Sequence, residues 1–103
     1  MAADALFSAL ADPTRRRLVE SLAASPATAT GLARDLPISR QAVAKHLTAL
    51  RAADLVSAER RGRETRYSLR PEPLREVSAW VDAVGAEWTS RLSRLERALD
   101  AER

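Results

Sequence analysis

The spacing of apolar residues changes at Leu55, and this change constrains the fold of the chain more than any other sequence feature. Before Leu55, apolar residues recur every three or four positions, as on one face of an α-helix. After it, side chains alternate in steps of two on both sides of Gly62 and Arg63, as in paired β-strands. Glycine permits the positive φ that a tight hairpin turn needs. The sequence therefore predicts one β-hairpin, at about residues 55–69.

Four short helices are predicted before this hairpin. Asp12, Thr28 and Ser39 are residue types that cap the free N–H groups of a first helical turn. Pro13 fits the first helical position, where a missing N–H costs nothing, and Pro37 forces a turn. We expect these helices at about residues 5–10, 13–24, 29–35 and 40–53.

A long amphipathic helix is predicted after the breaker segment that ends at Pro73. Its apolar residues are separated by three or four positions, in a heptad-like pattern with one stutter. Such a seam suits a partner helix, and a second copy of the same chain is the expected partner. We therefore expect a dimerisation helix at about residues 72–100.

Composition excludes several classes of function. The 103 residues suffice for one domain, which we expect to span residues 1–103. Cysteine is absent, so neither disulfides nor thiolate ligands can form. His46 is the only histidine and there is no glycine-rich phosphate loop, so we expect no enzyme, no cofactor and no metal. Neither a long apolar stretch nor a basic leader occurs, which favours a cytoplasmic protein without a membrane partner.

The fourth predicted helix has one apolar face and one polar face. Val43, Leu47 and Leu50 fall at helical spacing and should form a buried stripe. The polar face carries side chains suited to base edges, because Arg and Lys pair with guanine and Gln pairs with adenine. We therefore expect a helix-turn-helix, at about residues 29–53, whose second helix enters the major groove of double-stranded DNA. Base contacts are expected from Arg40, Gln41 and Lys45, and phosphate contacts from Ser39 and Thr48.

Arginines surround the predicted hairpin turn. A positively charged hairpin after a recognition helix is typical of a wing, which contacts flanking phosphates or a narrow minor groove. Charged edges that protect a hairpin from aggregation are the alternative interpretation. The fold class is thus mainly α with a small β-hairpin, a winged helix-turn-helix. The expected wing contacts are Arg60, Arg61, Gly62, Arg63 and Arg66.

Several stretches together resemble the ArsR/SmtB family of winged-helix repressors. They are residues 9–16 (ALADPTRR), residues 38–47 (ISRQAVAKHL) with Leu50, the pair Leu55-Val56, and Gly62-Arg63 before residues 67–69 (YSL). The resemblance implies a homodimer formed by the first and last helices, and repression by operator binding that an inducer relieves. It also implies that Ser39, Gln41, Lys45 and His46 lie at or near the DNA.

The resemblance and the apolar seam together define an expected dimer interface. Its residues come from the first and last helices. They are Leu6, Phe7, Leu10, Val77, Trp80, Val81, Val84, Trp88, Leu92 and Leu95.

The chain departs from metal-sensing members of the family, which use Cys, His and carboxylate ligands. A lone histidine cannot build a zinc site, which needs three or four ligands, so His46 is expected to contact phosphate or to pack. The inducer is unknown. Trp80 and Trp88 suit packing at the dimer interface, and a pocket for an apolar ligand is the alternative interpretation. An interaction module on the same scaffold is the rival function, although it has no need for arginines at a hairpin tip.

Overall fold

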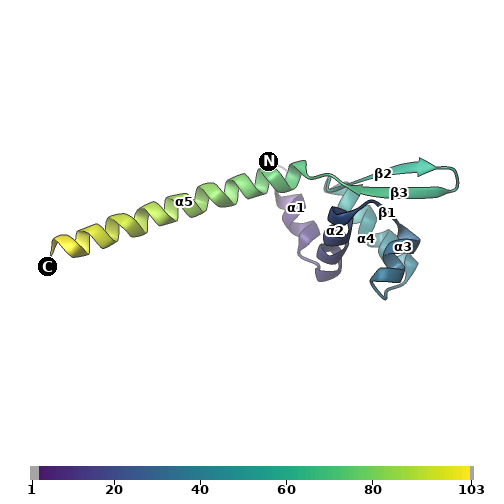
Figure 1. Ribbon diagram of the computed structural model, residues 1–103, viewed down its shortest axis with the longest axis horizontal. Coiled ribbons are helices and arrows are strands. Elements are labelled where there is room, and N and C mark those ends of the chain that lie inside the picture. Colours follow the sequence, from purple (N-terminus) through teal and green to yellow (C-terminus); the bar gives the residue numbers. More distant parts are fainter. Residues whose placement is uncertain (1–2, 103) are drawn as a thin grey trace. The chain divides into compact units, whose positions relative to one another are not determined.

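The computed structural model describes residues 3–102 (Figure 1). The chain divides into two compact units, Met1–Pro73 and Leu74–Arg103. The elements confirm a mainly α chain with a winged helix-turn-helix. In order they are α1 (Ala3–Leu10), α2 (Pro13–Ala24), β1 (Ala27–Thr28), α3 (Ala29–Asp35), α4 (Arg40–Ala52), β2 (Val56–Arg61), β3 (Glu64–Leu69) and α5 (Glu72–Ala101).

The start of α2 joins α1 through side-chain hydrogen bonds. Asp12 caps α2 as predicted, because its Oδ1 accepts from the backbone N–H groups of Thr14 at 2.8 Å and Arg15 at 3.1 Å. Arg16 turns back and donates from Nη1 to the carbonyl of Leu10 at 2.7 Å. This guanidinium thus satisfies a carbonyl that the end of α1 leaves without an intrahelical partner.

The other two predicted caps are also confirmed. Thr28 Oγ1 accepts from the N–H of Gly31 at 3.1 Å at the start of α3. Ser39 Oγ accepts from the N–H of Ala42 at 3.1 Å at the start of α4. Short side chains that accept from the first helical turn therefore fix where both helices of the helix-turn-helix begin.

The core of the first unit lies between the short helices and the sheet. Val43, Leu47 and Leu50 are each at most 1% exposed, so the predicted stripe of α4 is buried. Burial of such side chains is the main force that holds the unit together. The remaining buried residues are Leu6, Ala9, Leu18, Leu22, Leu32, Ala53, Leu55 and Val56.

Leu6 is one of the residues expected at the dimer interface. It is 1% exposed within the single chain, and Ala9, three positions later, is buried on the same face of α1. Its side chain therefore packs in the core of its own subunit, and its expected contact with a partner stays a prediction. Phe7 is on another face of α1 and is 46% exposed, while Leu10 is half-buried.

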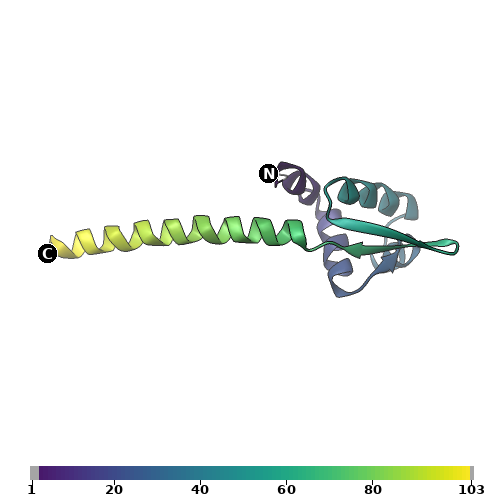
Figure 2. The ribbon, with the colours of Figure 1, turned by 90° about the horizontal axis from the view of Figure 1, so that it is seen from above.

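The wing is part of a three-stranded antiparallel sheet of order β1-β3-β2. The predicted hairpin forms β2 and β3, and Figure 2 shows its tip beyond the helices of this unit. The sequence did not predict β1, which pairs Ala27 with Tyr67 and Thr28 with Arg66. The short strand ties the segment before α3 to the hairpin.

The turn at the tip joins the paired residues Arg61 and Glu64 through two residues, Gly62 and Arg63. Gly62 has φ of +63°, whereas Arg63 keeps a negative φ. Glycine at the first central position is the signature of a type II′ turn, whose twist matches that of the strands. Gly62 is thus a turn residue, and this explains its place in the predicted wing.

The second unit consists of most of α5. None of its side chains is buried in the single chain, and the exposed apolar residues include Trp80 at 50%, Trp88 at 60% and Leu95 at 55%. Most of the apolar stripe of α5 is therefore exposed to solvent in the single chain. Among those residues, the structure has no helix with the length and apolar character needed to cross a membrane.

The end of α4 carries backbone strain at a single residue. The N–H of Asp54 donates to the carbonyl of Arg51 and that of Leu55 to the carbonyl of Leu50, both at 3.0 Å. This pattern is a Schellman motif, which places Asp54 in the left-handed region at φ of 59°. Glycine is the usual residue there because a Cβ is crowded in this conformation.

We predict that Asp54→Gly stabilises the protein. The substitution removes the steric cost of a Cβ in the left-handed region, about 1–2 kcal/mol, and adds the backbone entropy cost of glycine, about 0.5–1 kcal/mol. The free energy of unfolding should therefore rise by about 0.5–1 kcal/mol. The exposed ion pair of Asp54 with Arg70, at 3.8 Å, contributes little. Urea unfolding at fixed protein concentration measures the change, and Asp54→Ala, which keeps the Cβ, is the matched control. A glycine variant no more stable than the alanine variant would contradict the strain assignment.

Candidate nucleic-acid interface

The exposed face of α4 carries the residues predicted to contact bases. Arg40, Gln41 and Lys45 are all exposed. Gln41 and Lys45 lie opposite the buried stripe, whereas Arg40, three positions before Val43, is exposed at the start of the helix. Because Ser39 fixes the start of the helix, these side chains are in its first two turns. The first turn of a recognition helix is the part that reaches base edges. The structure thus places Gln41 and Lys45 on one solvent-facing surface, with Arg40 beside it at the start of the helix.

The two hydroxyl residues of α4 are placed differently. Ser39 Oγ accepts from the Ala42 amide, and its own O–H is free to donate to a phosphate. Thr48 Oγ1 donates to the carbonyl of Ala44 at 3.0 Å, so this hydroxyl is already used within the helix. Thr48 is exposed on the reading face, but only its acceptor capacity and methyl group remain for DNA.

His46 is engaged inside the first unit. Its ring is half-buried, and Nδ1 accepts a hydrogen bond from Arg15 Nε at 3.3 Å. This contact links α2 to α4, so it helps to fix the rotation of α4 in the core. Of the two expected roles, packing is the one that this geometry supports.

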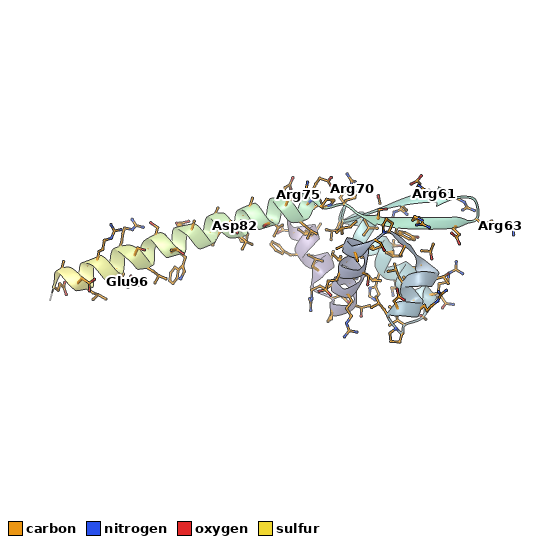
Figure 3. The ribbon with its side chains drawn as sticks, in the orientation of Figure 1. Arg61, Arg63, Arg70, Arg75, Asp82 and Glu96 are labelled. Atoms are coloured by element: carbon orange, nitrogen blue, oxygen red, sulfur yellow. The ribbon has the colours of Figure 1, made fainter. Side chains whose placement is uncertain are left out.

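The four arginines of the wing lie in different places. Along β3, Thr65 and Tyr67 point to one face, which is half-buried against α3 and α4, and Arg66 points to the other. We call the face that carries Arg66 the outer face of the wing. Arg61 is on this outer face, and Figure 3 shows it on the side away from the helices. Its Nε forms an ion pair with Glu59 Oε1 at 3.6 Å. The sequence pattern treated all four arginines as equivalent, and the strand alternation shows that they are not.

The other two wing arginines are at the tip or on the inner face. Arg60 is in register with Thr65, so it shares the face that looks towards α3 and α4, and its Nε donates to the Gly62 carbonyl at 3.2 Å. Arg63 is in the turn and lies at the tip in Figure 3. Its guanidinium makes no hydrogen bond or ion pair within residues 3–102.

A cleft of about 450 Å³ lies between α3, the start of α4 and the wing. We call it the basic cleft, because its lining includes three arginines and only one carboxylate, that of Glu64. The sequence analysis did not identify Arg34, Thr30, Thr65 or Tyr67 as candidate site residues. No local signal marks them, since the cleft exists only once the hairpin folds back over α3. Its arginines and hydroxyl residues are Arg34, Arg40, Arg63, Thr28, Thr30, Thr65 and Tyr67.

Comparison with known proteins decides the family. The helix-turn-helix domain family matches residues 10–57. The HTH-type transcriptional regulator Rv2034 of Mycobacterium tuberculosis is 40% identical, over 96% of this chain and 90% of that protein. An ArsR-like transcriptional regulator from Rhodococcus sp. RHA1 is 38% identical and superposes with a TM-score of 0.81, covering 93% of this chain and 91% of that one.

The chain belongs to the ArsR family of transcriptional regulators. It is therefore a DNA-binding regulator and not an enzyme, which confirms both the resemblance and the function class inferred from sequence. The transcriptional repressor SdpR of Bacillus subtilis is a further relative, 33% identical over 74% of this chain and 84% of that protein.

Metal-binding residues do not gather in the part of this ArsR family member that the structure describes. Within residues 3–102, no three side chains of His, Cys, Asp or Glu lie close enough to hold an ion. The whole sequence has no cysteine and a single histidine.

Asp12 gives this ArsR fold a pH-dependent helix cap. The pKa of Asp12 lies below its ordinary value, mainly because the Arg15 amide donates to the carboxylate, with a further contribution from Thr14. Partial burial acts in the opposite direction, while the nearby charges of His46 and Arg15 also lower the pKa. A lowered pKa means that the carboxylate stabilises the fold at neutral pH, and that this contribution is lost as pH falls through the folded pKa.

We predict that Asp12→Asn removes this pH dependence. Asparagine accepts the same backbone hydrogen bonds but does not titrate. The wild type should therefore lose stability relative to the variant as pH falls through the folded pKa of Asp12. Urea unfolding of both proteins between about pH 6 and pH 2 measures the difference. A stability difference that stays constant over this range would show that the Asp12 charge plays no part.

Proposed function

We propose that this protein is a homodimeric transcriptional repressor that binds an imperfect palindromic operator. The observation that carries the proposal is the exposed surface of α4, where Gln41 and Lys45, side chains suited to base edges, lie opposite a fully buried stripe. Membership of the ArsR family and the relation to the repressor SdpR support the same function.

The chemistry of each side chain suggests its part in recognition. Gln41 presents the donor and acceptor pair that matches adenine N7 and N6, while Arg40 and Lys45 suit guanine O6 and N7. Ser39 and Arg63 suit phosphates, which position the protein without reading sequence. Arg60 and Gly62 belong to the wing tip beside Arg63. We leave His46, Arg61 and Arg66 out of this interface, because the ring of His46 is engaged by Arg15 and the two arginines lie on the outer face of the wing.

The apolar stripe of α5 supports pairing with a second copy of the chain. From Val77 to Leu99 the stripe repeats every 11 residues, which brings Val77, Trp88 and Leu99 into one row. An 11-residue repeat favours nearly straight helices or a slight right-handed supercoil, rather than the left-handed coil of a strict heptad. Exposed apolar side chains of this size are costly in water, and a partner helix would cover them.

A symmetric dimer would present two α4 helices to one face of DNA. Half-sites should then lie about one helical turn apart, roughly 10 bp from centre to centre. With no cysteine and one histidine in the chain, we propose that the signal is not a metal ion. The surface hollow lined by Val84, Glu87, Trp88 and Arg91 is only about 140 Å³, so packing is favoured over an apolar inducer at Trp88.

The first test of this function is a fluorescence-anisotropy titration against the upstream DNA of its own gene and a scrambled duplex, at two salt concentrations. Tighter, salt-sensitive binding to the upstream DNA is expected. Gln41→Ala should reduce the discrimination by about 1–3 kcal/mol, whereas Arg63→Ala should weaken both duplexes alike. Equal binding of the wild type to both duplexes would refute the repressor and favour an interaction module.

A separate test addresses the dimer. Leu95→Lys places a charge on the exposed apolar stripe of α5, so it should shift sedimentation towards the monomer. Ser93→Lys is the matched control, because it adds the same charge at an exposed position that lies nearly opposite Leu95 around the helix. If both variants remained dimeric, or both dissociated equally, the stripe would not be the interface.

A further inference from the structure

The basic cleft is the feature that the sequence analysis missed altogether. It is bounded by Arg34 from α3, Arg40 from the first turn of α4 and Arg63 from the wing tip. All three side chains are exposed, and none has a hydrogen bond or ion pair within residues 3–102. Elsewhere in the same unit, Arg15, Arg16, Arg60, Arg61 and Arg70 are each engaged by neighbouring groups. Arg17, Arg51 and Arg66 are also unengaged among residues 3–102, but they do not line the cleft.

The charge and the hydroxyl groups of the basic cleft suit one class of ligand. Three guanidinium groups against the single carboxylate of Glu64 leave the cleft positively charged. Arg pairs readily with phosphate oxygens because its planar N–H donors fit them in a bidentate manner. Thr65 and Tyr67 add hydroxyl donors from the inner face of the wing.

The position of the cleft indicates which phosphate group would occupy it. It lies between the two elements that meet DNA in the proposed function, the start of α4 and the tip of the wing. A duplex whose major groove takes α4, and whose backbone passes under the wing, must carry one strand past this opening. A phosphodiester on that strand is therefore the group most favourably placed to enter.

We propose that the basic cleft binds a phosphodiester of the DNA backbone, with Arg34 as a DNA contact that positions α4 in the major groove. The proposal rests on the DNA-binding function proposed above. Arg34 then anchors the backbone from the α3 side, while Arg63 holds it from the wing.

The experiment compares Arg34→Ala with Arg17→Ala in the 103-residue chain, using the upstream duplex and a scrambled duplex over a range of salt concentrations. Arg17 is exposed on α2 and outside the cleft, so it removes the same charge elsewhere. Arg34→Ala should weaken binding to both duplexes several-fold and reduce the salt slope by about 1.8, because a dimer would lose two phosphate contacts at about 0.9 each. Arg17→Ala should change affinity less and leave the slope unaltered. Thermal melting checks that both variants fold.

A second arm tests for a free anion. The free wild-type protein is titrated with inorganic phosphate at constant ionic strength, following the amide NMR signals of Arg34 and Thr65. Saturable shifts that Arg34→Ala abolishes, together with an unchanged DNA salt slope in that variant, would overturn the proposal in favour of a small phosphorylated effector. Equal effects of Arg34→Ala and Arg17→Ala on DNA binding would also overturn it. Failure of the wild type to prefer its upstream duplex would instead count against the proposed function.

Discussion

Burial of the apolar face of α4 is the interaction on which the rest of this structure depends. Val43, Leu47 and Leu50 fill the centre of the first unit, and this fixes the rotation of the helix about its axis. The polar residues on the opposite face are therefore exposed to solvent together. The same helical spacing thus produces both the buried face of α4 and the exposed face that we propose reads DNA. The hydrogen bond between Arg15 and His46 reinforces the same orientation from the α2 side.

The sheet extends this constraint to the wing. The pairing of β1 with β3 ties the start of α3 to the hairpin, so that α3, α4 and the wing enclose the basic cleft. The alternation of β3 sends Tyr67 inward and Arg66 outward. Positive charge on the wing is therefore divided between an inner side, which faces the cleft, and an outer side, where arginine is balanced by glutamate.

The local features of the fold could be predicted from the sequence because their causes are local. Asp12, Thr28 and Ser39 cap helices within their own first turns, and Gly62 is needed for a turn of two residues. The features that were missed depend on residues far apart in the chain. No repeating sequence pattern indicates that β1 pairs with β3 or that Arg34 lines the cleft. The helix α1 is too short for its apolar pattern to show that Leu6 would be on the buried face.

If a dimer places two α4 helices on one face of an operator, as we propose, its affinity must depend on the spacing of the two half-sites. Binding should be measured on duplexes that carry the two half-sites at their natural separation, and with about 5 and about 10 bp inserted. We expect a large loss of affinity at 5 bp, where the second half-site faces the opposite side of the duplex. At 10 bp the two half-sites again share one face, so part of the affinity should return if the dimer can span the added length. Affinity that is unaffected by the 5 bp insertion would contradict the account, because it would mean that each α4 binds DNA independently.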